Sequence, residues 1–258
     1  KARVYDSLRD TGLVPAFAAL AREAIAAGEA DDWFRRGAWL RDVSEGSTSG
    51  KGALHVRHPE EARAWLTLSA GTERFMVSDF LPGRNLACLL LFDDGNLVKT
   101  GSYERLEYFM ARTAVSGVTG NICKGRLIND EAALAVSLQA VRRLCELTGE
   151  RMTGLVTVDL RGDGEDCPRV TEINLRQVAA ASAFAQVPGA NLAEAHALMT
   201  LGRADLVGPV EVRFPPHNRL LRDIDGTPVY VDHFRPLSVG EALGATLGTA
   251  STTEGAMA

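Results

Sequence analysis

Apolar side chains recur along the chain with two periods, and each period predicts one kind of element. Helical spacing is clearest over 131–148, where Leu134, Leu138, Val141 and Cys145 form one stripe. Gly149 follows this stripe and is typical of a helix end, so we predict a helix there. The same spacing predicts further helices over 1–10, 16–30, 59–70 and 191–201.

Short apolar runs between turn residues predict strands. Asp93, Asp94 and Gly95 separate two such runs and predict a hairpin turn. Residues 111–130 are expected to form a long loop with a functional role, and 244–258 lose all periodicity, which predicts disorder. Strands are expected over 38–43, 53–56, 74–81, 86–92, 96–101, 154–160 and 169–175, with another hairpin over 218–234.

Composition narrows the class of protein. The 258 residues are 46% hydrophobic and 24% charged, with a net charge of −5. These values exclude a disordered chain, and no apolar run is long enough to span a membrane. The acidic balance disfavours nucleic acid as a partner. Four scattered cysteines without a CxxC pair favour a reducing, cytoplasmic compartment, and Lys1 in place of a starting methionine suggests a longer chain.

Two predicted strands, 154–160 and 169–175, bring together the strongest candidate site. Alternation places Glu172, Asn174 and Arg176 on one face with Val170, and Ile173 and Leu175 on the core face. If the strands pair, Asp159 lies opposite Glu172. Facing carboxylates need a cation between them, and Asn174 adds a third oxygen, so the pattern predicts Mg²⁺. A solvated polar strand face is an equal alternative.

A glycine-rich segment over 46–52 is a second candidate. It lacks the spacing of a P-loop, because three residues rather than four separate its first glycine from the Gly-Lys pair. A hairpin with free N–H groups and Lys51 can still hold phosphates, although a plain flexible turn is the simpler interpretation. Arg41, on the strand before it, favours the phosphate interpretation.

The segments WLRDVSEGSTSGKG (39–52), VSDFLPG (77–83) and TEINLR (171–176) occur in an order that resembles the ATP-grasp superfamily. The likeness covers about residues 1–202 and is strongest to the ATP-binding domains of carbamoyl-phosphate synthetase large chains and of carboxylate–amine ligases. It implies an α+β fold of two lobes with ATP between them, and an amino-terminal domain that is absent from this chain. It further implies a small lobe over 1–75, a large lobe over 76–206, and a carboxy-terminal hairpin and tail over 207–258.

The resemblance also implies roles for individual residues. Arg176 and Lys51 would be catalytic, with Arg176 stabilising the transferred phosphoryl group. Asp159, Glu172 and Asn174 would bind Mg²⁺, two ions being expected and Mn²⁺ a substitute. ATP would contact Lys1, Arg41, Gly46, Ser47, Ser49, Gly50, Asp79, Phe80, Leu81 and Asn85. Asp79 stands where the family usually has glutamate.

The implied activity is an ATP-dependent carbon–nitrogen ligase. A small carboxylate such as an amino acid would form an acyl phosphate, and an amine would then displace phosphate to give an amide. Two alternatives remain open: phosphorylation of bicarbonate, as in carbamoyl phosphate synthesis, and a nucleotide-binding module without catalysis. The expected partners are the carboxylate and the amine, the missing amino-terminal domain and, as one expected assembly, a second copy of the chain.

Overall fold

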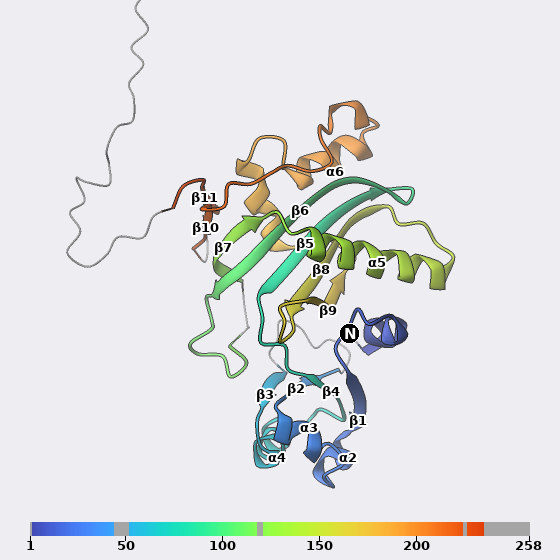
Figure 1. Cartoon of the computed structure of the whole chain (residues 1–258), viewed down its shortest axis with the longest axis vertical. Coiled ribbons are helices and arrows are strands. Elements are labelled where there is room, and N and C mark those ends of the chain that lie inside the picture. Colours follow the sequence, from blue (N-terminus) through green and yellow to red (C-terminus); the bar gives the residue numbers. More distant parts are fainter. Residues whose placement is uncertain (1, 44–51, 118–120, 224–225, 235–258) are drawn as a thin grey trace, which may run out of the picture.

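The computed structural model describes residues 2–43, 52–117, 121–223 and 226–234. Within them the strands form two antiparallel sheets, one above the other in Figure 1. The smaller sheet has the order β1-β4-β2-β3 and the larger one the order β11-β10-β7-β6-β5-β8-β9. This arrangement is an α+β fold with two lobes, as predicted.

The smaller sheet carries three helices on one face. Its strands are β1 (Phe17–Ala21), β2 (Ala38–Asp42), β3 (Ala53–Val56) and β4 (Arg74–Asp79). The helices are α2 (Arg22–Ala26), α3 (Asp31–Arg36) and α4 (Pro59–Leu68). Ile25, Phe34 and Leu66 from the three helices pack on Leu40 and Val77 of the sheet, which gives this lobe a core of its own.

The larger sheet is covered on both faces. Helix α5 (Glu131–Thr148) lies on one face, and the 3-10 helix η2 (Ala179–Gln186) with α6 (Leu192–Thr200) on the other (Figure 1). Its strands are β5 (Asn85–Asp93), β6 (Asn96–Tyr108), β7 (Ile122–Ile128), β8 (Gly154–Gly162), β9 (Pro168–Asn174), β10 (Arg219–Leu221) and β11 (Val229–Val231). Buried on both sides, β5 is a continuous apolar run.

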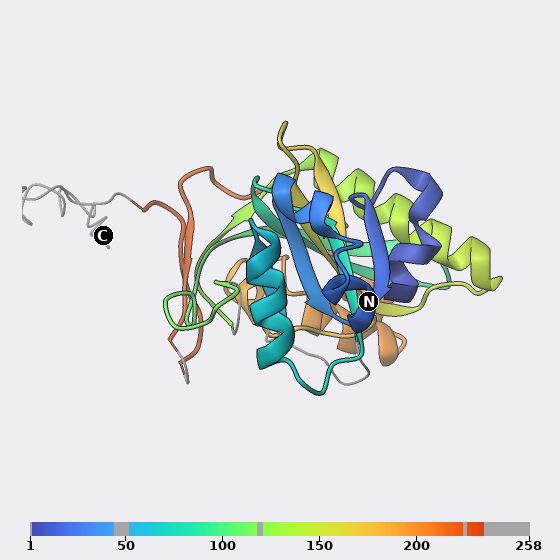
Figure 2. The ribbon, with the colours of Figure 1, turned by 90° about the horizontal axis from the view of Figure 1, so that it is seen from below.

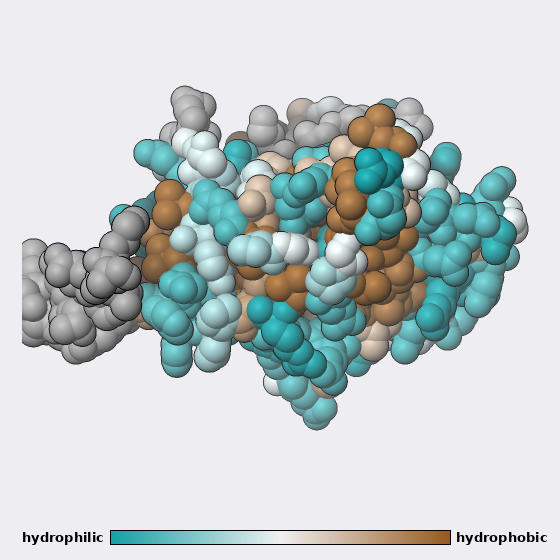
Figure 3. All heavy atoms as spheres, turned by 90° about the horizontal axis from the view of Figure 1, so that it is seen from above, coloured by the Kyte–Doolittle hydropathy of each residue, from teal (hydrophilic) through white to brown (hydrophobic). Residues whose placement is uncertain are grey.

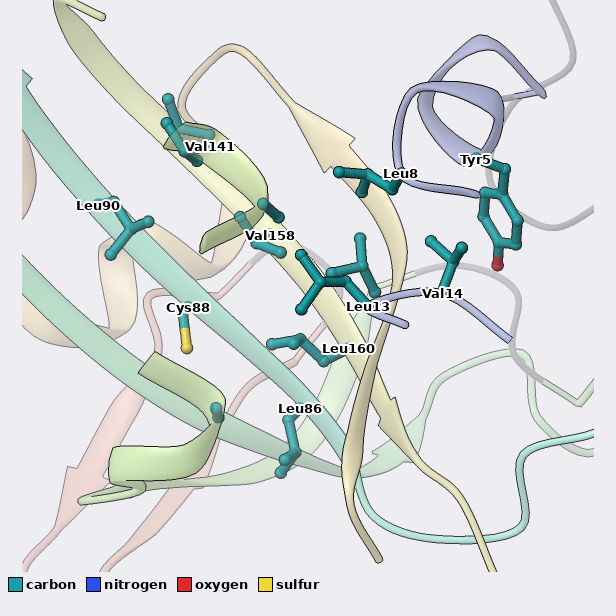
Figure 4. Packing of buried hydrophobic residues seen from close by; sticks show 14 of the residues in the cluster. Tyr5, Leu8, Leu13, Val14, Leu86, Cys88, Leu90, Val141, Val158 and Leu160 are labelled. Atoms are coloured by element: carbon teal, nitrogen blue, oxygen red, sulfur yellow. The ribbon is translucent and has the colours of Figure 1, made fainter. Parts of the chain in front are cut away.

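The amino-terminal helix belongs to the core of the larger sheet. Tyr5 and Leu8, from α1 (Ala2–Ser7) and the turn before the short helix η1 (Arg9–Thr11), pack with Leu86 and Leu160 (Figure 4). From below, the smaller sheet and α4 lie in front of the larger lobe (Figure 2). The chain therefore packs first against the larger sheet through α1, crosses to the smaller sheet at β1, and returns to the larger sheet after β4.

Helix α5 confirms the clearest prediction. The Asp130 carboxylate accepts a hydrogen bond from the Ala133 N–H at 2.9 Å, which caps the amino end. Gly149 ends the helix in the left-handed conformation at φ 72°, where the lack of a Cβ avoids strain. The hairpin of β5 and β6, the pairing of β8 with β9, and the hairpin of β10 and β11 are confirmed as well.

Two sequence predictions were wrong. Residues 16–30 were expected to be one helix, but Phe17–Ala21 form β1 and pair with β4, so the helix begins only at Arg22. Alanine carries little periodic signal, and pairing with β4 overrides its helix propensity. The expected loop over 111–130 contains β7, which is held between β6 and β10. The domain boundaries stay a prediction, and residues 244–258 lie outside the described part.

No helix in the part of the chain that the structure describes is both long and apolar enough to cross a bilayer. The face seen from above in Figure 3 is mostly polar, with apolar patches between the polar side chains. Leu201 and Leu206 are exposed apolar residues of the segment after α6.

Candidate active site

A cleft of about 390 Å³ is lined by residues of both sheets. Among the lining residues of the described chain, arginines outnumber carboxylates by four to three. An excess of positive charge in a concave site favours an anionic ligand. The charged lining residues are Arg41, Arg105, Arg161 and Arg222, with Asp79, Asp159 and Glu172.

Asp159 and Glu172 lie directly opposite each other on β8 and β9, as the sequence predicted. Both side chains line the cleft and are half-buried. The carboxylates of such a cross-strand pair repel unless a cation neutralises them. This pair is therefore the part of the cleft at which positive charge is most strongly required.

A β-bulge beside this pair changes which residues share its face. Thr171 is the extra residue, because Asp159 pairs with Glu172 and Leu160 already pairs with Val170. The Thr171 hydroxyl donates to the Asp159 carbonyl at 3.1 Å. Val170 is consequently buried in the core rather than on the Glu172 face, so strict alternation gave a wrong assignment.

Two residues near the end of β9 also lie differently from the expected pattern. Leu175 was expected to face the core but is 67% exposed, because the strand ends at Asn174. Arg176 follows it, is exposed, and donates to the Gln177 carbonyl at 3.2 Å. Arg176 is not among the residues that line the cleft, and its catalytic role stays a prediction.

The cation beside Asp159 is Arg105 of β6. Its guanidinium forms an ion pair with the Asp159 carboxylate and donates to the Tyr103 hydroxyl at 2.8 Å. It also donates to the Asn85 side-chain oxygen and the Leu86 carbonyl, each at 3.0 Å. Burial opposes the charge most strongly, but the Asp159 carboxylate and the hydroxyls of Tyr103 and Tyr108 together outweigh it and raise the pKa of Arg105. Arg105 thus fixes the carboxylate and supplies part of its neutralisation.

No sequence motif pointed to Arg105. The predicted strand ended at residue 101, whereas β6 continues to Tyr108, so Arg105 was never placed in the sheet. The one available signal was its spacing of two residues from Tyr103, which places both side chains on the same face of an extended strand.

The acidic residues fit a divalent cation of the magnesium type. The Asn174 amide donates its Nδ2–H to Asp159 Oδ2 at 3.3 Å, so Asn174 lies beside the opposed carboxylates and its Oδ1 would have to turn toward a bound ion to serve as a ligand. Hard cations bound by one or two carboxylates take their remaining ligands from water and phosphate. No group of three or more His, Cys, Asp and Glu side chains with metal-binding geometry exists in the described part of the chain. Asp159, Glu172 and Asn174 therefore suit an ion that a phosphate ligand helps to hold.

Arg41 connects the two lobes across the cleft. It lies on β2, and its guanidinium donates to the Thr171 carbonyl of β9 at 3.2 Å. Tyr5 lines the cleft close to the same place. Burial raises the pKa of Tyr5, which the charge of Arg41 partly offsets and that of Glu172 reinforces. Arg41 and Glu172 are thus near enough to act on one ligand group.

Three consecutive residues that were predicted to contact ATP also line the cleft. Asp79 ends β4, and Phe80 and Leu81 follow it, all three on the cleft wall. The Phe80 ring stacks on His55, with centroids 3.6 Å apart and planes 5° apart. Asn85 lines the cleft too and donates to the Tyr108 hydroxyl at 2.9 Å. These placements bring four of the predicted nucleotide-binding residues to one site.

Six predicted residues lie outside the described part of the chain, and their roles stay predictions: Lys1, Gly46, Ser47, Ser49, Gly50 and Lys51. The structure adds cleft residues that lie outside every motif, including Tyr108, Arg161 and Arg222. They come from three separate segments, so no local spacing pointed to them.

Sequence comparison alone finds no relative. No known family model matches the chain, and no curated protein matches it.

Comparison with solved structures does find the fold. The carboxyaminoimidazole ribonucleotide synthase from Aspergillus clavatus, complexed with ATP, is 14% identical with a TM-score of 0.64, and the match covers 86% of this chain and 55% of that one. For N5-carboxyaminoimidazole synthetase from Staphylococcus aureus, complexed with ADP, identity is 14%, the TM-score 0.64 and the coverage 85% and 55%. For phosphoribosylamine–glycine ligase from Thermotoga maritima, identity is 16%, the TM-score 0.59 and the coverage 88% and 60%.

The chain spans little more than half the length of these solved proteins. They are ATP-grasp ligases, and the match extends over both sheets of the present structure because it covers more than four fifths of the chain. The two-lobed architecture predicted from three short motifs is therefore confirmed: this chain has the ATP-grasp fold.

Proposed function

We propose that the protein is an ATP-dependent ligase that joins a small carboxylate, such as an amino acid, to an amine. The carboxylate would attack the γ-phosphate of ATP to give an acyl phosphate and ADP, and the amine would then displace phosphate. The observation that carries the proposal is the directly opposed pair Asp159 and Glu172, placed in a cleft that is otherwise rich in arginine. The ATP or ADP bound to two of the similar structures supports the choice of nucleotide.

The chain would contribute mainly position and charge. Asp79, Phe80 and Leu81 would hold the nucleoside at the junction of the lobes, and Arg41 would direct the phosphates toward Glu172. Bound at Asp159, Glu172 and Asn174, Mg²⁺ would supply charge neutralisation for the phosphate oxygens. Lys1, Lys51 and Arg176 would complete the phosphate contacts. Correct positioning of two reactants accounts for much of the rate in such transfers.

No side-chain nucleophile is needed, and the structure is consistent with this. Cys88 is fully buried, and burial raises the pKa of its thiol to about 11, so it stays protonated. The cleft-lining residues of the described chain include neither cysteine nor histidine. Direct transfer between bound substrates would need no covalent enzyme intermediate.

The test is ATP-dependent phosphate release by the full chain with Mg²⁺ and a panel of amino acids and small carboxylates, each with and without an amine. Bicarbonate alone is a separate arm, because release in that arm only would favour the carbamoylating alternative. Glu172→Gln should abolish Mg²⁺-dependent ADP formation, since the carboxylate charge is lost at nearly constant size. Glu165→Gln, an exposed loop residue away from the cleft, is the matched control.

Unchanged turnover in Glu172→Gln, with the control equally active, would refute the metal assignment. The thermal unfolding midpoint of both variants shows whether the fold is intact. Mn²⁺ binding followed by electron paramagnetic resonance gives an independent measure of the ion site.

One observation favours a second function, a nucleotide-binding module without catalysis. The Asp159 carboxylate is already engaged by buried Arg105, and Arg176 lies outside the cleft lining. Mg²⁺-dependent ATP binding with no ADP formation under any substrate condition would support this alternative over the ligase.

A further inference from the structure

The arginines of the cleft differ in how their charge is satisfied. Arg105 is paired with Asp159, and Arg41 donates to a backbone carbonyl. Arg161 and Arg222 form no side-chain hydrogen bond or ion pair within residues 2–43, 52–117, 121–223 and 226–234, and the Nε–H of each is buried without an acceptor. A buried donor that has lost water without gaining a partner costs free energy. The positive charge of Arg161 and Arg222 therefore lacks a negative counterpart among the described residues.

The two arginines reach the cleft from different parts of the larger sheet. Arg161 of β8 is the cross-strand partner of Asn85, and Asn85 donates to the Tyr108 hydroxyl at 2.9 Å. Arg222 follows β10, and its N–H donates to the Cys123 carbonyl at 3.0 Å, one residue from Ile122, which pairs with Tyr108. Arg161, Arg222 and Tyr108 all line the cleft.

The charged lining of the cleft agrees with an incomplete site. The carboxylates that line the cleft in the described chain are Asp79, Asp159 and Glu172, and none pairs with Arg161 or Arg222. Trp39, on the opposite lobe, adds a third lining residue with a buried N–H and no acceptor. The unsatisfied group of each of these three cleft residues is a donor.

We propose that Arg161 and Arg222 form an oxyanion subsite of the cleft that binds carboxylate or phosphate groups of the ligand. The planar guanidinium fork suits both anions because it donates two parallel hydrogen bonds. The subsite deepens the proposed function, since the anion would belong to the molecule that is joined. Binding of the anion itself is independent of ATP.

The experiment measures the thermal unfolding midpoint of the full chain against sodium phosphate and, separately, sodium acetate, with ionic strength held constant by chloride. Either anion should raise the midpoint of the wild type with a saturable dependence. The response should weaken at least about tenfold in apparent affinity in Arg161→Met and in Arg222→Met, which each lose charge-assisted hydrogen bonds. Arg142→Met, an exposed residue of α5, is the control for net charge.

The outcomes separate the ideas. Response to acetate alone identifies a carboxylate group, and response to phosphate alone identifies a phosphate group. No response in the wild type, or an equal response in both arginine variants and the control, overturns the subsite. Circular dichroism checks the fold of each variant, and Arg161→Lys, which keeps the charge without the fork, serves if Arg161→Met does not fold. Failure of the wild type to bind MgATP would overturn the proposed function but not the oxyanion subsite.

Discussion

The buried pair of Arg105 and Asp159 offers the sharpest prediction about stability. Replacing Arg105 with methionine keeps the apolar stem but removes donors that satisfy Asp159, Tyr103, Asn85 and the Leu86 carbonyl. The two side chains of the ion pair are only 11% and 19% exposed, so water can replace little of what is lost. Breaking a buried pair by removing one partner costs about 3–5 kcal/mol. We expect the lower end, about 3 kcal/mol, because Asp159 keeps some access to water.

Urea denaturation of the full chain measures this cost as a shift of the transition midpoint. The matched control is Arg151→Met, which breaks an arginine–aspartate pair of similar length, Arg151 to Asp94 at 2.7 Å, whose side chains are 70% and 64% exposed. That exposed pair should contribute less than about 1 kcal/mol. Arg105→Met combined with Asp159→Leu should recover part of the loss, because no unpaired charge stays buried.

Equal costs for Arg105→Met and Arg151→Met would refute the reasoning. So would strict additivity in the double variant, because it would mean that the two side chains do not interact.

Two further predictions concern the smaller lobe and the core. Burial, reinforced by the charge of Arg57, lowers the pKa of His55. The unfolded protein therefore binds more protons at this residue, and stability should fall as the pH drops through about 6.5. The difference between the unfolding midpoints at pH 5 and pH 7 should be lost in His55→Phe, which keeps an aromatic ring on Phe80. Gly101→Ala would place its Cβ 2.5 Å from the buried Phe184 ring and should lower the free energy of unfolding, measured in urea, by about 1–3 kcal/mol. Gly71→Ala, with nothing within 4 Å of its Cβ, should be nearly neutral. A smaller loss of stability for Gly101→Ala than for Gly71→Ala would contradict the packing.

Local signals in the sequence predicted much of the fold. Helix α5 was found because its apolar stripe and final glycine agree with each other. The β5–β6 hairpin and the pairing of β8 with β9 were found because a short turn leaves adjacent strands few other partners. Asp159 and Glu172 therefore met as expected.

The failures have a common cause, which is that distant segments decided the outcome. β1 is a strand because β4 accepts it, although its alanines favour a helix. One bulge at Thr171 moved Val170 from the predicted polar face into the core. No spacing within β9 could reveal that extra residue, since the register of a bulge depends on the partner strand.

The sequence by itself determined the motifs, the helix and hairpins with strong local signals, and the two acids that face each other. The tertiary structure alone decided which charges surround those acids. Arg105, Arg161 and Arg222 come from β6, β8 and the segment after β10, and they reach one cleft only because the sheet aligns these strands side by side. Electrostatic satisfaction depends on distance in space rather than along the chain, so a sequence pattern can name a charged residue without revealing whether anything neutralises it.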